Sequence, residues 1–123
     1  MAGMWPHEAI DARAARVLME IHGARRLTVH EIIRATARVF DVQRTDIIRQ
    51  SVFPEHLVPR QLAMAIACAK LAGTPRGARA HIGREFCRDR TCVRRAVLRY
   101  GGLVERVIRE RELPLPSDLE LTA

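Results

Sequence analysis

Arginine gathers in one short stretch of the chain, residues 82–97, which reads IGREFCRDRTCVRRAV. The planar guanidinium group of arginine holds its N–H donors in a fixed fork, which matches the oxygens of a phosphate or the edge of guanine. Asp89 stands directly before Arg90 and Thr91, where its carboxylate can accept hydrogen bonds from the first backbone N–H groups of a helix. These residue types in this order indicate a surface that binds a polyanion.

The composition of the whole chain agrees with a polyanionic partner. Of the 123 residues, 48% are hydrophobic and 28% are charged, which is typical of a single globular domain. The formal net charge is +7, and Lys70 is the single lysine, so arginine carries nearly all of the positive charge. Such a balance favours nucleic acid as the partner, although a GC-rich genome also raises the arginine content.

Several other classes of protein are not expected. No segment approaches the roughly 18 apolar residues of a membrane span, and Glu8 and Asp11 interrupt the first residues, which lack the apolar core of a signal peptide. Cys68, Cys87 and Cys92 form no CxxC pair, which favours reduced thiols over a disulfide or zinc framework. No nucleophile motif, carboxylate pair or glycine-rich cofactor loop is present. We therefore expect a cytoplasmic, nucleoid-associated protein that is no enzyme and binds no metal, cofactor or membrane.

Helices must position the arginine stretch, because apolar residues recur at helical spacing and no strand-like alternation occurs. The pattern predicts an all-α protein of about six helices. They cover about residues 6–22, 28–40, a short segment capped by Thr45, 59–73, 78–86, and Asp89 to about residue 112 with a pause at Gly101–Gly102. Thr28 and Glu31 form a predicted capping box, Pro59 is expected in a first helical turn, and Pro54 in the loop before it. Residues 113–123 are predicted to be a flexible tail.

The last two predicted helices flank a tight turn, and the second of them is rich in basic residues. This is the pattern of a helix-turn-helix, in which the second helix enters the major groove of DNA. Many basic helical hairpins do not contact DNA, so the spacing alone also allows a protein-interaction module.

The segment IGREFCRDRTCV resembles the signature of the C-terminal DNA-binding domain of the bacterial replication initiator DnaA, approximately Ile-Gly-x-x-Phe-Gly-Gly-Arg-Asp-His-Thr-Thr-Val. The segments LTVHEIIRATARVFDVQRTDII and VPRQLAMAIA are similar to upstream helices of the same domain, so the resemblance covers about residues 27–100. It implies a Trp-repressor-like or DnaA-C-terminal-like helix-turn-helix domain over residues 27–112, preceded by a helix within residues 1–26 that lies outside the match. It also implies sequence-specific binding of double-stranded DNA in the control of transcription or replication initiation, in a bacterium, plasmid or prophage.

The resemblance implies that the DNA contacts come from Arg60, Gln61, Arg88, Asp89, Arg90, Thr91, Arg94 and Arg95. Arg60 and Gln61 would begin a helix whose free N–H groups can hold a phosphate. Arg90 replaces the histidine of the signature and can donate two parallel hydrogen bonds to O6 and N7 of guanine. Asp89 either caps the helix or accepts from a cytosine, and the arginines after it either bind phosphates or form a solvated basic face.

The chain also departs from the DnaA pattern. It contains no GxxxxGK[ST] phosphate loop and no ATPase segment, so we expect no nucleotide to bind. Val52 stands where the family has an arginine that enters the minor groove, so loop 51–58 is not expected to read that groove, and Arg76 or Arg79 would have to supply the contact. Cys87 stands in place of two glycines, which shortens the turn by one residue.

A protein–protein interaction module that has lost specific DNA binding is the alternative function. The first helix carries Trp5, Val17, Leu18 and Ile21, which can pack on the core of the same chain or on a second subunit. The second possibility would make the protein a homodimer.

Overall fold

A computed structural model describes residues 5–24, 26–49 and 53–112, and in these residues the chain forms helices and no strand. The elements are α1 (His7–Ile21), α2 (Val29–Phe40), α3 (Arg44–Ile48), α4 (Pro54–Lys70), the 3-10 turn η1 (Pro75–Gly77), α5 (Arg79–Glu85) and α6 (Arg90–Glu112). The predicted all-α fold of about six helices is therefore confirmed.

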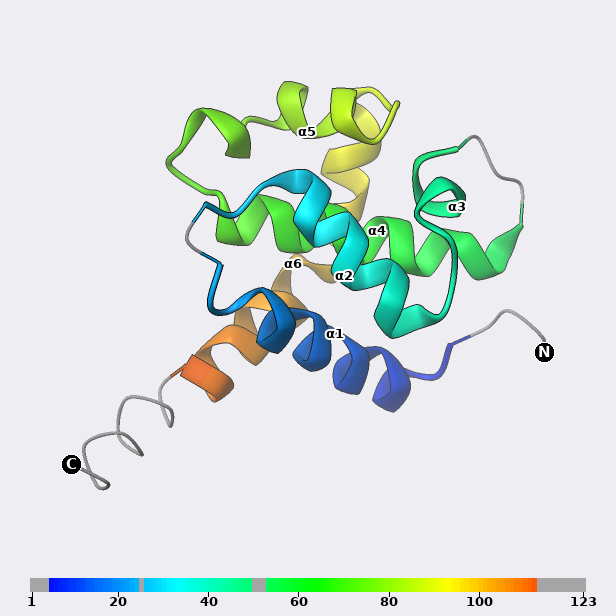
Figure 1. The fold of residues 1–123 in the computed structure, drawn as a ribbon, viewed down its shortest axis with the longest axis vertical. Coiled ribbons are helices and arrows are strands. Elements are labelled where there is room, and N and C mark those ends of the chain that lie inside the picture. Colours follow the sequence, from blue (N-terminus) through cyan, green and yellow to red (C-terminus); the bar gives the residue numbers. More distant parts are fainter. Residues whose placement is uncertain (1–4, 25, 50–52, 113–123) are drawn as a thin grey trace.

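Helix α4 lies at the centre of the fold (Figure 1). It packs against α6, α2, α3 and α5, and all six residues from Leu62 to Ala67 are buried. A helix that is apolar on every side must be covered by neighbours all round, and the alanines of α4 let those neighbours approach closely. Helices α5 and the start of α6 lie on one side of α4 in this view, and α1 lies on the other side.

Helix α2 shows how directly some local predictions are met. The hydroxyl of Thr28 accepts a hydrogen bond from the backbone N–H of Glu31 at 3.2 Å, so Thr28 is the N-cap, but the return bond from the Glu31 side chain that a capping box requires is not formed among the described residues. Val29, Ile32 and Phe40 are all buried, and the helix ends where Asp41 adopts a left-handed conformation with φ 55°.

Helix α1 belongs to the same hydrophobic core as the rest of the domain. It packs against α2 and α6, and Val17, Leu18 and Ile21 are buried. The ring of Trp5 meets the ring of Phe40 edge-on with the centroids 5.1 Å apart. Of the two expectations for these residues, the structure shows packing on the core of their own chain.

The predicted starts of two helices are wrong. Helix α3 begins at Arg44 and not after Thr45, because the backbone N–H of Gln43 donates to Asp46 Oδ2 at 3.0 Å, so the cap lies two residues earlier than predicted. Helix α4 begins at Pro54, which takes the first helical position, so Pro59 is inside the helix. Pro59 itself and the residues from Leu62 to Ala67 after it are buried, so packing holds this part of the helix together despite the lost backbone donor.

Helix α6 continues through Gly101 and Gly102, where a pause was expected. Tyr100 and Val104 are buried on either side of the two glycines, so packing on the core holds this part of the helix in place. The predicted tail, residues 113–123, lies outside the described residues. None of the helices in the described part of the chain has the length and apolarity needed to cross a membrane.

Candidate nucleic-acid interface

Helices α5 and α6 are joined by a four-residue turn, Phe86–Asp89. The backbone N–H of Arg88 donates to the carbonyl of Gly83 at 2.8 Å, and that of Cys87 donates to Arg84 at 3.1 Å. This pair of bonds is the Schellman arrangement that ends a helix, and it requires a left-handed residue, here Cys87 with φ 55°. Cys87 thus has the backbone conformation that usually selects glycine.

Gly83 permits the close approach of α5 to the turn. A Cβ atom at this position would lie 2.7 Å from the carbonyl oxygen of Arg88. Ile82 and Phe86 on one side and Val93 and Ala96 on the other are buried, so apolar packing fixes both helices relative to the core. The start of α6 is therefore held in a defined position.

Asp89 caps helix α6, as one of its two expected roles required. Its Oδ1 accepts a hydrogen bond from the backbone N–H of Cys92 at 3.0 Å. Hydrogen bonds from Cys92 and Thr91, together with the charge of Arg95, lower the pKa of this carboxyl group. The carboxylate is thus ionised at neutral pH and is directed to the helix terminus.

The exposed face at the start of α6 is cationic. Arg90, Thr91, Arg94 and Arg95 are all exposed, and Arg90 and Arg94 are one helical turn apart on the same face. Arg90 and Arg94 make no hydrogen bond or ion pair with any other described residue. Four of the residues with an expected role in DNA binding are thus brought together at one surface.

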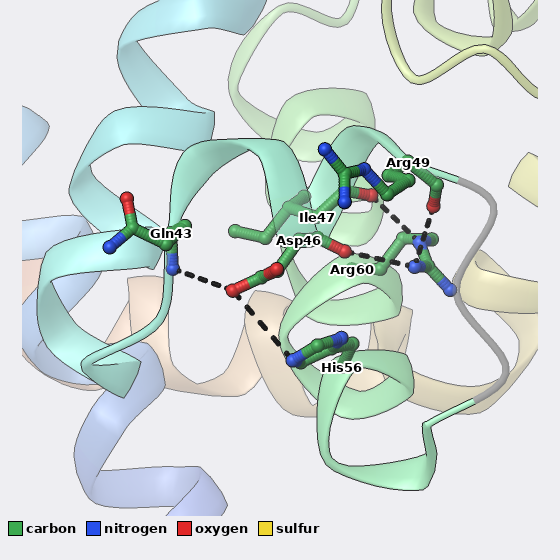
Figure 2. Close-up of polar contacts among 6 residues, drawn as sticks. All are labelled: Gln43, Asp46, Ile47, Arg49, His56 and Arg60. Carbon is green, nitrogen blue, oxygen red and sulfur yellow. Dashed lines mark hydrogen bonds and ion pairs between the residues drawn. The ribbon is translucent and has the colours of Figure 1, made fainter.

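Arg60 lies elsewhere, and its expected phosphate contact is not supported by its position. Its side chain is 5% exposed. Its Nε donates to the carbonyl of Ile47 at 2.7 Å, and its Nη2 donates to those of Asp46 and Arg49 at 3.1 Å each. Figure 2 shows the guanidinium group of α4 reaching the carboxyl end of α3. Burial and the charge of Arg88 lower the pKa of Arg60.

Arg88 is directed to the same end of α3. Its Nη2 donates to the carbonyl of Arg49 at 2.8 Å, and its Nη1 lies within 3.4 Å of the carbonyls of Ile48, Cys87 and Phe86. The last four carbonyls of any helix have no partner within the helix. In the five-residue helix α3, two arginines from other parts of the chain supply the missing donors.

Through these hydrogen bonds, Arg60 connects α3 to α4, and Arg88 connects α3 to the turn before α6. Gln61, the neighbour of Arg60, is half-buried, and its Oε1 is buried without a hydrogen-bond partner among the described residues. A signal for the burial of Arg60 was present in the sequence, because Pro59 to Ala67 contains only this one charged residue. No sequence pattern indicated the role of Arg88.

Arg79, for which only a minor-groove contact was expected, joins the cationic face. Together with Arg90, Thr91 and Arg94 it lines an open hollow of about 570 Å³. Arg76 instead donates through Nη1 to the carbonyl of Leu27 at 3.1 Å. Val52, whose position bears on reading the minor groove, lies outside the described residues.

The three cysteines carry free thiols, and Cys87 is exposed while the other two are half-buried. Burial raises the pKa of Cys68, which keeps its thiol protonated and poorly reactive.

The cationic face combines arginines, a threonine and a helix terminus, and these groups can bind an anion by charge and hydrogen bonding. Comparisons of this chain with protein-family models, with curated proteins and with solved structures find no match.

Proposed function

We propose that this protein binds double-stranded DNA sequence-specifically, with α5, the turn and α6 acting as a helix-turn-helix. The observation that carries the proposal is the start of α6, where exposed arginines gather on a helix whose opposite face is buried. In proteins of this class the first turns of the second helix meet base edges in the major groove. The buried residues of α6 would hold those turns rigid against the DNA.

The proposed roles follow from position on α6. Arg90 is in the first turn, where its two donors can pair with O6 and N7 of guanine. Thr91 is beside it and can contact a thymine methyl group or a phosphate. Arg94 and Arg95 are one turn further on and would bind backbone phosphates. Asp89 sets the direction of the helix through its cap.

The resemblance to the C-terminal domain of DnaA supports a role in transcription control or replication initiation, in a bacterium, plasmid or prophage. We propose on the same ground that the chain is a DnaA-like DNA-binding protein without nucleotide-dependent activity. Its DNA target would differ from the usual target of the family, because Arg90 and Cys87 alter the contact surface.

The salt dependence of DNA binding tests this proposal. Since Arg60 and Arg88 are occupied internally, two or three phosphate contacts remain, and the log–log slope of affinity against salt should be about −2 to −3. Fluorescence anisotropy with a labelled duplex pool at several salt concentrations measures this slope. A slope near zero, or no complex at low salt, contradicts the proposal.

A protein-interaction module is the second candidate, and one observation favours it. A groove of about 480 Å³ lies between α1, α4 and α6, lined mainly by apolar residues that include Trp5, Leu57, Tyr100 and Leu103. Apolar surface of this kind can receive a partner protein or a second copy of the chain. An interaction module should form no complex with DNA at any salt concentration.

A further inference from the structure

A hollow lies on the cationic face between the starts of α5 and α6. Its lining consists of Ala78, Arg79, Ala80, Arg90, Thr91 and Arg94. The alanines are small, so the long arginine side chains surround open space. The hollow is open to solvent and has a volume of about 570 Å³.

The charges in this hollow have one sign. Three arginines from two different helices line it, and no carboxylate does. Arg79, like Arg90 and Arg94, is exposed and forms no hydrogen bond or ion pair with another described residue. Like charges that share a site repel one another unless an anion lies between them.

Other arginines of the chain do have anionic partners. Arg38 donates to Glu20 at 2.9 Å, and Arg106 donates to Asp11 at 2.6 Å. The hollow thus collects guanidinium groups without a counter-charge from the described part of the chain.

We infer that Arg79 of α5 and Arg94 of α6 together hold one phosphodiester of the DNA backbone in this hollow. This inference rests on the proposed function and assigns a contact to the first helix of the pair. Two guanidinium forks that approach from different helices can each donate to the phosphate oxygens, and the Thr91 hydroxyl can add a third donor.

A phosphate held at this point would fix the register of α6 on the duplex. Phosphate contacts position a protein without reading sequence, whereas base contacts specify it. Arg90 also lines the hollow, one helical turn before Arg94. With the phosphate held there, the guanidinium group of Arg90 would lie at the edge of a neighbouring base. Loss of Arg79 should thus weaken binding to all sequences and leave the preferred base unchanged.

The test is a set of duplexes in which one backbone phosphate at a time is replaced by an uncharged methylphosphonate. Wild type, Arg79→Ala, Arg94→Ala and the double variant are titrated against each duplex. Arg84→Ala is the matched control, because Arg84 is also exposed on α5 but does not line the hollow. Thermal melting of each variant checks that the fold is retained.

At one phosphate, neutralisation should weaken wild type and Arg84→Ala, while Arg79→Ala and Arg94→Ala should both lose much of that sensitivity. The double variant should lose about one phosphate contact, so its affinity should fall about eightfold less than that of wild type per tenfold rise in salt. Sensitivity lost at two different phosphates, or unchanged in Arg79→Ala, overturns the inference and leaves the proposed function standing.

If wild type binds no duplex, both the inference and the proposed function are wrong. Inorganic phosphate is the second probe, added to the wild type and to Arg79→Ala without DNA. If it raises the melting temperature of wild type alone, while Arg79→Ala keeps the wild-type methylphosphonate profile, the hollow takes a free anion and the inference fails.

Discussion

Two groups of arginines in this molecule have opposite surroundings. Arg60 and Arg88 converge on the carboxyl end of α3, where backbone carbonyls occupy their donors. Arg90 and Arg94 extend from α6 into solvent and meet no anionic group of the described chain. The side-chain chemistry is the same in both groups, so the surroundings decide which arginines stabilise the fold and which can bind a ligand.

The difference arises from the length of α3. A helix of five residues cannot satisfy its own last carbonyls, and the nearest arginine side chains supply the donors. Helix α6 has 23 residues and an aspartate cap at its start, so its exposed arginines are not needed to complete the backbone hydrogen bonding. Exposed, uncommitted donors are what a nucleic-acid surface requires.

Arg60→Ala should have the largest effect on stability. It removes three hydrogen bonds and leaves the carbonyls of Asp46 and Ile47 without their donor, and the lost bond to Ile47 is buried; the carbonyl of Arg49 keeps its bond from Arg88. We expect a loss of about 3–4 kcal/mol in the free energy of unfolding, measured by urea denaturation. Arg94→Ala is the control and should unfold as wild type does. Wild-type stability with weakened DNA binding in Arg60→Ala would show that Arg60 binds DNA as Arg90 and Arg94 are proposed to do.

Arg88→Ala should have a smaller effect, because its site is only partly buried. Loss of its hydrogen bonds to α3 and to the turn should lower the free energy of unfolding by about 1–2 kcal/mol. The salt slope of DNA binding should stay close to that of wild type, since no phosphate contact is lost. A slope reduced by about one, at unchanged stability, would place Arg88 on the DNA instead.

The cap of α6 should show a dependence on pH. The pKa of Asp89 is lowered in the folded state, so its ionised form stabilises the fold above the unfolded pKa of about 3.9. That contribution is lost as the pH falls through the lowered folded value. Asp89→Asn keeps a capping oxygen without the charge, so it should be less stable than wild type at pH 7, and the difference should shrink in acid. A constant difference between pH 7 and pH 2.5 would contradict the charged cap.

Much of the fold could be predicted from local sequence. The spacing of apolar residues indicated every long helix, and the caps at Thr28 and Asp89 follow from short-range chemistry that the structure confirms. The start of α3 is set by the contact between Gln43 and Asp46, and Pro54 takes the first helical position of α4, which suits proline. At Pro59 and at the two glycines of α6, packing outweighs the preferences of single residues.

The candidate site was harder to predict, because the sequence does not distinguish an arginine that binds a backbone carbonyl from one that is free to bind a phosphate. The carbonyls that occupy Arg60 are 11 to 14 residues away along the chain, and the α3 carbonyls that occupy Arg88 are 39 or 40 residues away. Helical spacing carries no information about such partners. The same reasoning applies to Arg79, whose approach to α6 depends on the turn between the two helices.

Selection of binding sites from a random duplex pool tests the central claim most directly, with wild type, Arg90→Ala and Arg95→Ala in parallel. Wild type should prefer a guanine at one position, and Arg90→Ala should lose about 1–3 kcal/mol on the selected site and lose discrimination at that base pair alone. Arg95→Ala should keep the preference, weaken all sequences about equally and lower the salt slope by about one. Full base preference in Arg90→Ala, or a preference altered only by Arg95→Ala, would contradict the assignment of these two arginines.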